Sequence, residues 1–402
     1  MNTDTARRED PRTPGHLLVL GSGPRAEWEH ATKRLAEAGP LVLIDDEPAS
    51  WQRQYVSAAR VANTSRPETV EQAARWLAIE HPITGVLHFH PAHVRAAAAI
   101  RATFGLPGPT AATVAATTLR NRTLELMERG GIPSSGGCHA DTFDQALEGA
   151  HIFGFPLVCK PAAPRRRYAA RVVESLEQLA EAFSAATAAS WPGTGTIVEP
   201  RLDGIEATAY TLNGRLVAIS HATFDPEAEP SLLPLEVVVD ADDVCAAAIE
   251  GTVTRALEST GHRHGVAQIR LRITSSGARV ISLATHLTDP LVAELIEQVT
   301  GIDLITAAGH HARGLPAEAE DTPLGAAAIR YLQGTAATRL LSGPAGQSGI
   351  TPYARLDRYG SDTRAGPLLR RGHLLVSGTD FPQCVARLRN AITEMHTTPA
   401  TT

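Results

Sequence analysis

Cationic side chains are the groups in this sequence best suited to chemistry, and lysine is scarce among them. Of the 37 basic residues, only Lys33 and Lys160 are lysines, and all the others are arginines. Lys160 ends an apolar segment, residues 156–160, from which a long side chain could reach across a cleft. A cation in such a place can neutralise a phosphate or a carboxylate. We therefore predict that Lys160 binds an anion, and the alternative is a solvated surface lysine.

Other charged side chains follow Lys160 along the chain. The loop at residues 162–170 contains no glycine, so its arginines could attract phosphate only through their side chains. Arg270 lies in a predicted strand, residues 266–273, where the alternation of side chains leaves an outward-facing arginine as the alternative. Two glutamates are available to neutralise these cations. The candidate residues for anion binding are Arg165, Arg166, Arg167, Glu199, Glu206 and Arg270.

The elements that must position these side chains divide into three parts. Strand-like and helix-like segments alternate up to about residue 110, which is typical of a doubly wound, Rossmann-like sheet. The first turn, Gly21-Ser22-Gly23, lacks the third glycine of a dinucleotide-binding motif, so we interpret it as a tight turn. Two groups of strands follow, with a hairpin turn at Asn213-Gly214. We expect strands at 16–20, 41–44, 85–88, 156–160, 171–173, 196–199, 207–212, 215–220, 266–273, 279–283, 326–332 and 373–376, and helices at 25–38, 70–80, 92–104, 111–129, 142–150, 176–189, 242–259 and 381–395.

The composition argues against several classes of protein. A formal net charge of −6 disfavours a nucleic-acid partner, which would require a basic surface. No apolar run approaches the roughly 20 residues that cross a bilayer. Residues 1–14 are polar, and we expect a disordered tail there rather than a secretory signal. Four cysteines without a CxxC pair fit a reducing, cytoplasmic location, with Cys159 as a core residue.

Histidines offer a further set of interpretations. His88, His90 and His93 form H-x-H-x-x-H at the end of a strand. A metal site, a pocket between domains and simple exposure to solvent all remain open for these three. Two other pairs are interpreted as surface residues. They are His262 with His264, and His310 with His311.

Several short motifs occur in one order along the chain. The most specific is Gly-Phe-Pro-Leu-Val-Cys-Lys-Pro at 154–161, and Val-Glu-Pro-Arg-Leu-Asp-Gly-Ile-Glu follows at 198–206. In this order the motifs resemble the ATP-grasp superfamily, and its carboxylate–amine ligases that join amino acids in particular. The weaker matches are Gly-Leu-Pro-Gly-Pro at 105–109, Leu-Arg-Asn-Arg at 119–122, Gly-Ile-Pro at 131–133, and the segments 325–332 and 371–378.

The resemblance implies an α/β (α+β) protein in which ATP lies between two sheets. In that family a carboxylate becomes an acyl phosphate, and an amine then displaces the phosphate. Arg122 takes the place of a phosphate-contacting lysine, Lys160 matches a second one, and Glu199 and Glu206 match the hinge over adenine and ribose. The implied parts are a disordered tail (1–14), a Rossmann-like domain (15–110), an ATP-grasp domain (111–325), a C-terminal lid module (326–395) and a second tail (396–402).

The metal site departs from the family pattern. The family has a glutamate on the strand at 266–273 and an E-x-N-x-R segment on the next strand. Here Arg270 stands at the first position, and Ser282, Ala284 and His286 stand at the second. Mg²⁺ prefers carboxylate oxygens, so we do not expect it to bind tightly, whereas ATP remains a candidate ligand. Arg270 could instead neutralise an anion itself.

Two classes of function follow from the resemblance. The first is a ligase-like protein with impaired or altered Mg-ATP chemistry, whose cleft binds a small anion such as a nucleotide, a phosphate or a carboxylate. The second is a non-catalytic pseudo-ligase that acts as a partner or scaffold subunit. In that case the arginine run would dock an acidic surface, in a homodimer or on an active ligase subunit. Neither class requires a nucleic acid or a membrane.

Overall fold

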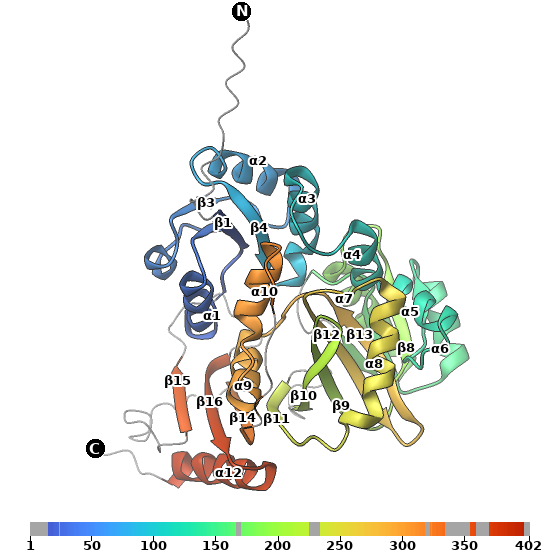
Figure 1. Ribbon diagram of the computed structural model, residues 1–402. Coiled ribbons are helices and arrows are strands. Elements are labelled where there is room, and N and C mark those ends of the chain that lie inside the picture. The colour runs from blue at the N-terminus through green and yellow to red at the C-terminus, as the bar shows by residue number, and fades with distance from the viewer. Residues whose placement is uncertain are drawn as a thin grey trace, which may run out of the picture.

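The computed structural model arranges the chain as three β-sheets with helices packed around them (Figure 1). It describes residues 15–23, 25–165, 170–224, 234–317, 322, 324–333, 354–358 and 370–397. No helix within these ranges is long and apolar enough to cross a membrane.

A four-stranded parallel sheet forms the N-terminal part, in the order β3-β2-β1-β4. Its strand β1 (His16–Leu20) is buried along its whole length, as expected for a parallel strand between two helical layers. This confirms the doubly wound arrangement predicted from the sequence. The other elements here are β2 (Leu41–Asp45), β3 (Ala58–Val61), β4 (Ile83–His88), α1 (Arg25–Glu37), α2 (Pro67–Leu77), α3 (Val94–Phe104), η1 (Trp51–Gln54) and η2 (Pro91–His93).

A second four-stranded sheet, which is antiparallel, carries Lys160 and Glu199 in the order β5-β8-β6-β7. Lys160 pairs with Ile197, and Glu199 lies two residues along β8 on the same face. The alternate residues, Cys159 and Val198 among them, pack into a core with helices α6 and α7. One face of this sheet is therefore apolar, and the other presents charge. The elements are β5 (Cys138–Ala140), β6 (Leu157–Pro161), β7 (Arg171–Val173), β8 (Thr196–Pro200), α6 (Phe143–Phe153) and α7 (Leu176–Ala189).

The third sheet has eight strands in the order β13-β12-β9-β10-β11-β14-β16-β15, and every neighbouring pair is antiparallel. The predicted Asn213-Gly214 hairpin joins β9 to β10, and both turn residues have positive φ. The C-terminal strands extend the same sheet. The strands are β9 (Ile205–Leu212), β10 (Arg215–Phe224), β11 (Pro234–Asp240), β12 (Val266–Thr274), β13 (Gly277–Ala284), β14 (Ala326–Gln333), β15 (Ala354–Arg358) and β16 (Arg370–Gly378).

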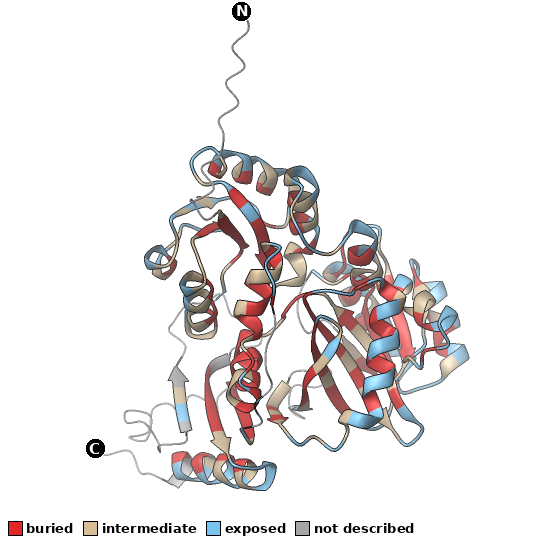
Figure 2. Ribbon diagram, viewed as in Figure 1, coloured by how far each residue is buried: buried red, intermediate tan, exposed pale blue. Residues whose placement is uncertain are grey.

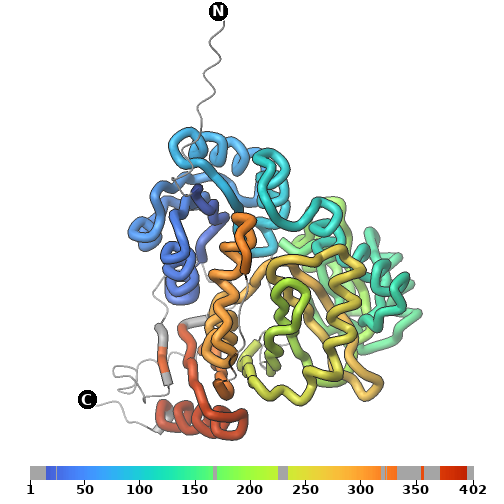
Figure 3. Tube along the Cα trace, in the orientation of Figure 1, coloured from blue at the N-terminus to red at the C-terminus, as the bar shows by residue number. Residues whose placement is uncertain are grey.

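Helices α9 (Pro290–Thr300) and α10 (Leu304–Ala312) lie between the N-terminal sheet and the eight-stranded sheet (Figure 3). They contact α1 and β4 on one side and β10, β11 and β14 on the other. Almost all of α9 is buried (Figure 2). The elements expected above do not include α9, because a helix buried on all sides lacks the one-sided apolar stripe that identifies a surface helix. The chain's last described helix is α12 (Phe381–Thr397).

The helix expected at 111–129 is instead two helices, α4 (Ala111–Thr118) and α5 (Arg120–Arg129). Leu119 separates them with extended backbone angles, φ −90° and ψ 109°. Together with α8 (Ala246–Thr260), α5 packs against the eight-stranded sheet through a second core. The break at Leu119 determines which arginine enters the charged site described next.

Candidate functional site

Lys160 and Glu199 form the centre of a buried group of polar side chains. Lys160 Nζ donates a hydrogen bond to Glu199 Oε1, and Ser135 Oγ donates one to Glu199 Oε2 at 2.8 Å. Arg120 Nη2 lies 4.0 Å from the same Oε2 atom. Lys160 is the most exposed of the four residues, at 8%. We call Lys160, Glu199, Ser135 and Arg120 the Lys160 cluster.

Arg120 reaches this cluster because α5 begins at that residue. Its backbone N–H donates to the carbonyl of Ala162, directly after β6, at 2.8 Å. This bond ties the start of α5 to the strand that carries Lys160. The Arg120 side chain is only 6% exposed, and its Nε and Nη1 atoms have no hydrogen-bond partner among the described residues. A buried guanidinium with unused donors is costly unless an anion pairs with it.

The segment before β5 connects the Lys160 cluster to the eight-stranded sheet. Ser135 N–H donates to the carbonyl of Val280 on β13 at 3.0 Å, and Val280 N–H donates to the carbonyl of Pro133 at 2.9 Å. Gly137, with φ +125°, then passes against Glu199, and a Cβ atom there would lie 2.9 Å from Glu199 Cβ. Glu199 is thus held by a segment that also pairs with β13.

A second charged group lies on the eight-stranded sheet, around Glu206 of β9. Arg270 Nε donates to Glu206 Oε1 at 3.1 Å, and Arg272 Nη2 donates to Oε2 at 2.9 Å. Both arginines belong to β12, which pairs with β9 so that Arg272 lies opposite Glu206. Glu206 is 5% exposed. We call Glu206, Arg270 and Arg272 the Glu206 cluster.

The two clusters influence each other electrostatically. Burial, and then the charge of Arg120, lower the pKa of Lys160 to about 7, although Glu199 opposes both effects. Arg270 also lowers the pKa of Lys160, and after burial it lowers that of Arg120. The two clusters together contain four cations, Lys160, Arg120, Arg270 and Arg272, but only the two acids Glu199 and Glu206. Their excess positive charge favours an anionic ligand.

Solved structures resemble this chain over almost its whole length, whereas no model of a known protein family matches it. An L-amino acid ligase from Bacillus licheniformis superposes with a TM-score of 0.78 at 18% identity, over 95% of this chain and 98% of that chain. The chain has the ATP-grasp fold.

Two other solved structures support the ATP-grasp assignment. The biotin carboxylase domain of the 2-oxoglutarate carboxylase from Hydrogenobacter thermophilus, solved with MgADP, ADP and bicarbonate, gives a TM-score of 0.71 at 15% identity. That match covers 94% of this chain and 89% of the other. N5-carboxyaminoimidazole synthetase from Staphylococcus aureus, complexed with ADP, gives 0.73 at 14% identity, over 94% and 97% of the two chains. At such identities the likeness establishes the fold.

The strand positions at which the ATP-grasp resemblance expects magnesium carboxylates are occupied by other residue types here. Arg270 on β12 pairs across the sheet with Ser282 on β13, and Gln268 pairs with Ala284. None of these four side chains is an acid, and the nearby Glu206 already accepts hydrogen bonds from two arginines. Mg²⁺ is usually held by one or two carboxylates, and these four side chains supply none.

Some predicted anion-binding residues lie away from the two clusters. The exposed Arg122 pairs with Glu125, with 2.8 Å between Nη1 and Oε2, so Arg120 and not Arg122 joins Lys160. The reason is the break at Leu119, which turns Arg122 toward solvent. Arg165 is exposed, and its Nη2 donates to the carbonyl of Ala188 at the end of α7 at 2.7 Å. Arg166 and Arg167 lie outside the described residues.

His286 belongs to a different environment, the contact between β13 and the N-terminal sheet. Its ring lies 4.5 Å from that of His88, centroid to centroid. Burial, followed by the neighbouring His286, holds the pKa of His88 well below its ordinary value, so His88 is neutral near pH 7. His90 and His93 lie beside each other, with ring centroids 5.5 Å apart. Of the three interpretations left open above, simple exposure to solvent is wrong for His88, which is only 4% exposed.

Sequence reasoning missed the burial of His262 and a group of possible metal ligands. His262 is 4% exposed, not a surface residue, and burial lowers its pKa to about 4. Its loop context gave no sign of this, because the neighbouring His311 belongs to α10, which is distant in sequence. Within the described ranges, three metal-ligating side chains come together at His221, Asp243 and Cys245.

Proposed function

We propose that this protein is an ATP-grasp, ligase-like protein that binds the phosphates of a nucleotide without a carboxylate-held magnesium ion. In this proposal the Lys160 and Glu206 clusters bind the anion together. The ligase reaction of the amino-acid ligases it resembles is impaired or altered, because no acid stands at the expected metal positions. A non-catalytic role as a partner subunit remains the second reading of the same residues.

The observation that carries the proposal is the Arg120 guanidinium. It is buried, two of its nitrogen atoms have no described hydrogen-bond partner, and it lies next to a lysine whose charge is also only partly balanced. Unused donors in a low-dielectric setting gain much more from an anion than exposed ones do. A phosphate or carboxylate oxygen would satisfy Arg120 and restore the full charge of Lys160.

Arg270 supports the same conclusion from the other sheet. Its side chain is 40% exposed although Glu206 accepts its hydrogen bonds, so it can turn toward a ligand without losing a buried position. In place of a metal ligand, a guanidinium supplies positive charge directly and in a fixed geometry. A cation at this position also repels Mg²⁺, which agrees with the lack of acids at Ser282 and Ala284.

Calorimetric titration with ADP in a chelating buffer tests the proposal, with Arg120→Met as the variant and Arg122→Met as the matched control. The two arginines lie two residues apart on one helix, one buried and one exposed. We expect ADP to bind the wild type without Mg²⁺, at least about tenfold more weakly after Arg120→Met, and unchanged after Arg122→Met. ADP binding that strictly requires Mg²⁺, or equal effects of the two substitutions, would contradict the proposal.

Phosphate release from ATP separates the two functional classes. We expect little release with or without Mg²⁺, in the presence of mixed amino acids. Magnesium-dependent release that disappears in Lys160→Met would show that other acids hold the metal and that the enzyme retains ligase-type chemistry. Binding of ADP without turnover would favour a nucleotide-binding, non-catalytic protein.

A further inference from the structure

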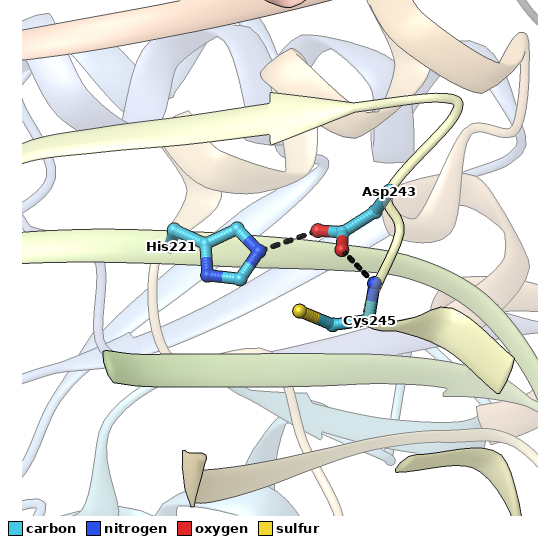
Figure 4. A group of neighbouring side chains, drawn as sticks. All are labelled: His221, Asp243 and Cys245. Atoms are coloured by element: carbon cyan, nitrogen blue, oxygen red, sulfur yellow. Dashed lines mark hydrogen bonds and ion pairs between the residues drawn. The ribbon is translucent and has the colours of Figure 1, made fainter. Parts of the chain in front are cut away.

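A group of side chains with the ligand types of a zinc site lies beside strand β10 of the eight-stranded sheet (Figure 4). His221 comes from β10, whereas Asp243 and Cys245 come from the connection between β11 and α8. One ligand atom from each, a ring nitrogen, a carboxylate oxygen and a sulfur, lies within 4.8 Å of the other two. We call these three residues the His221 group.

The local structure holds the three side chains together before any ion binds. His221 Nε2 and Asp243 Oδ2 are 2.5 Å apart, and Cys245 N–H donates to Asp243 Oδ1 at 2.8 Å. Figure 4 shows the imidazole and the thiol converging beside this carboxylate. Cys245 occupies the N-cap of α8, but its side chain makes no capping hydrogen bond. The sulfur is therefore not used by the helix.

The strand register of the eight-stranded sheet places the His221 group on the face opposite to Arg270. Arg270 lies opposite Thr208, which in turn lies opposite Ser220, so these three share one face. His221 follows Ser220 and consequently points to the opposite face, where Ile219 packs with α8. A ligand of the His221 group would not occupy the region of Lys160 and Arg120.

The surroundings of the group are acidic. Burial, and then the charges of Asp242, Asp243 and Asp380, raise the pKa of Asp240, which shows that these acids repel one another. Asp243 accepts its hydrogen bonds from His221 and Cys245, the two residues that would share the ion with it. Several carboxylates gathered in one place favour a bound cation.

We infer that His221, Asp243 and Cys245 form a zinc-binding site that ties β10 to the start of α8. Imidazole and thiolate are ligands that select Zn²⁺ over Mg²⁺ or Ca²⁺. Three protein ligands leave the fourth tetrahedral position to water. On binding, the Cys245 thiol releases its proton to solvent, and the proton on His221 Nε2 is exchanged through solvent for one on Nδ1, which has no hydrogen-bond partner among the described residues. The His221–Asp243 hydrogen bond is thereby replaced by two bonds to the metal. The partly exposed imidazole gives the ion access.

The chain contains a matched control with the same side-chain types. Cys138, His139 and Asp141 also lie near one another, and His139 Nε2 is 3.7 Å from Asp141 Oδ1. Cys138 and His139 are successive residues of strand β5, so their side chains point to opposite faces. Cys138 is directed toward Gly149 of α6. This trio cannot share one ion.

Cobalt titration of the chelator-treated full-length protein tests the site. We expect one equivalent of Co²⁺ to produce thiolate-to-cobalt charge-transfer absorption, and Zn²⁺ to remove it by displacement. Cys245→Ser should lose the absorption, and Cys138→Ser should retain it. Zn²⁺ should raise the thermal unfolding midpoint of the wild type and of Cys138→Ser, but not that of Cys245→Ser or His221→Gln.

X-ray absorption spectroscopy of the zinc-loaded wild type does not depend on the folding of any variant. It should show one sulfur ligand at about 2.3 Å, with nitrogen and oxygen ligands at about 2.0–2.1 Å. A wild-type protein without charge-transfer absorption at stoichiometric Co²⁺, absorption that survives Cys245→Ser, or zinc without a sulfur ligand would each overturn the inference.

Discussion

The Lys160 cluster and the Glu206 cluster each centre on a buried glutamate, but their cationic side chains differ in exposure to solvent. In the first, Lys160 and Arg120 are buried along with Glu199. In the second, Arg270 remains 40% exposed and Arg272 19% exposed beside the buried Glu206. Buried charges cannot exchange a lost partner for water, whereas exposed ones can. From this difference we expect the Lys160 cluster to contribute more to stability and, in the function proposed above, to anion binding than the Glu206 cluster does.

Removing each glutamate in turn should give the largest difference between the clusters. Glu199→Gln leaves Lys160 and Arg120 buried without a countercharge, so we expect a loss of about 3–5 kcal/mol in the free energy of unfolding. Glu206→Gln should cost only about 1 kcal/mol, because Arg270 can turn to solvent. Urea denaturation measures both. Equal losses would mean that burial does not distinguish the two clusters.

Introducing acids into the Glu206 cluster should convert it into a metal site. Arg270→Asp with Ser282→Glu places two carboxylates on a cross-strand pair beside Glu206. Without Mg²⁺ the three acids repel one another, and a bound ion should stabilise the variant by about 2.7 kcal/mol at 100 times its dissociation constant. Thermal unfolding with and without MgCl₂ measures this gain. Ser282→Glu alone, which retains the Arg270–Glu206 pair, is the control and should show no response.

The lowered pKa of Lys160 predicts a specific pH dependence of anion binding. Sulfate, which does not titrate in this range, should bind best below pH 7 and up to tenfold more weakly per unit as pH rises above about 7, where free Lys160 loses its proton. The lowered pKa of Lys160 also makes the free energy of unfolding depend on pH. The unfolded lysine still holds its proton between pH 7 and its ordinary pKa, so stability without ligand should rise with pH across that window.

Calorimetry in two buffers of different ionisation enthalpy checks the sulfate prediction, because binding at pH 8 should take up a proton. Lys160→Met is the control and should show no proton uptake and a flat pH profile. Arg120, Glu199 and Arg270 are the other charged groups acting on this lysine. A wild-type profile as flat as that of the variant would show that Lys160 is fully charged throughout.

The smallest effect is expected at Arg122. Its pair with Glu125 is exposed and lies three residues along one helix, a kind of contact that contributes about 0–1 kcal/mol. Arg122→Ala should leave the urea midpoint almost unchanged. A loss as large as that of Glu206→Gln would show that Arg122 contacts part of the structure that its exposed position does not suggest.

The sequence by itself determined much of the fold and the centre of the site. Their motifs were enough to predict that Lys160 and Glu199 face the same cleft. Each lies near the end of a short apolar strand, in which successive side chains point alternately to the core and to the charged face. The sequence alone also reveals that no acid stands between Gln268 and Ser282, because residue types can be read without knowledge of contacts. The ATP-grasp fold followed from the order of these segments.

Only the tertiary structure decided which cations accompany Lys160. Arg120 replaces Arg122 because an extended residue, Leu119, interrupts what looks like one continuous helical pattern. The pairing of Glu206 with Arg270 and Arg272 depends on the register of β9 and β12, which are about 60 residues apart in the chain. Local patterns contain no information about such a register, since it is set by packing between segments that are distant in sequence.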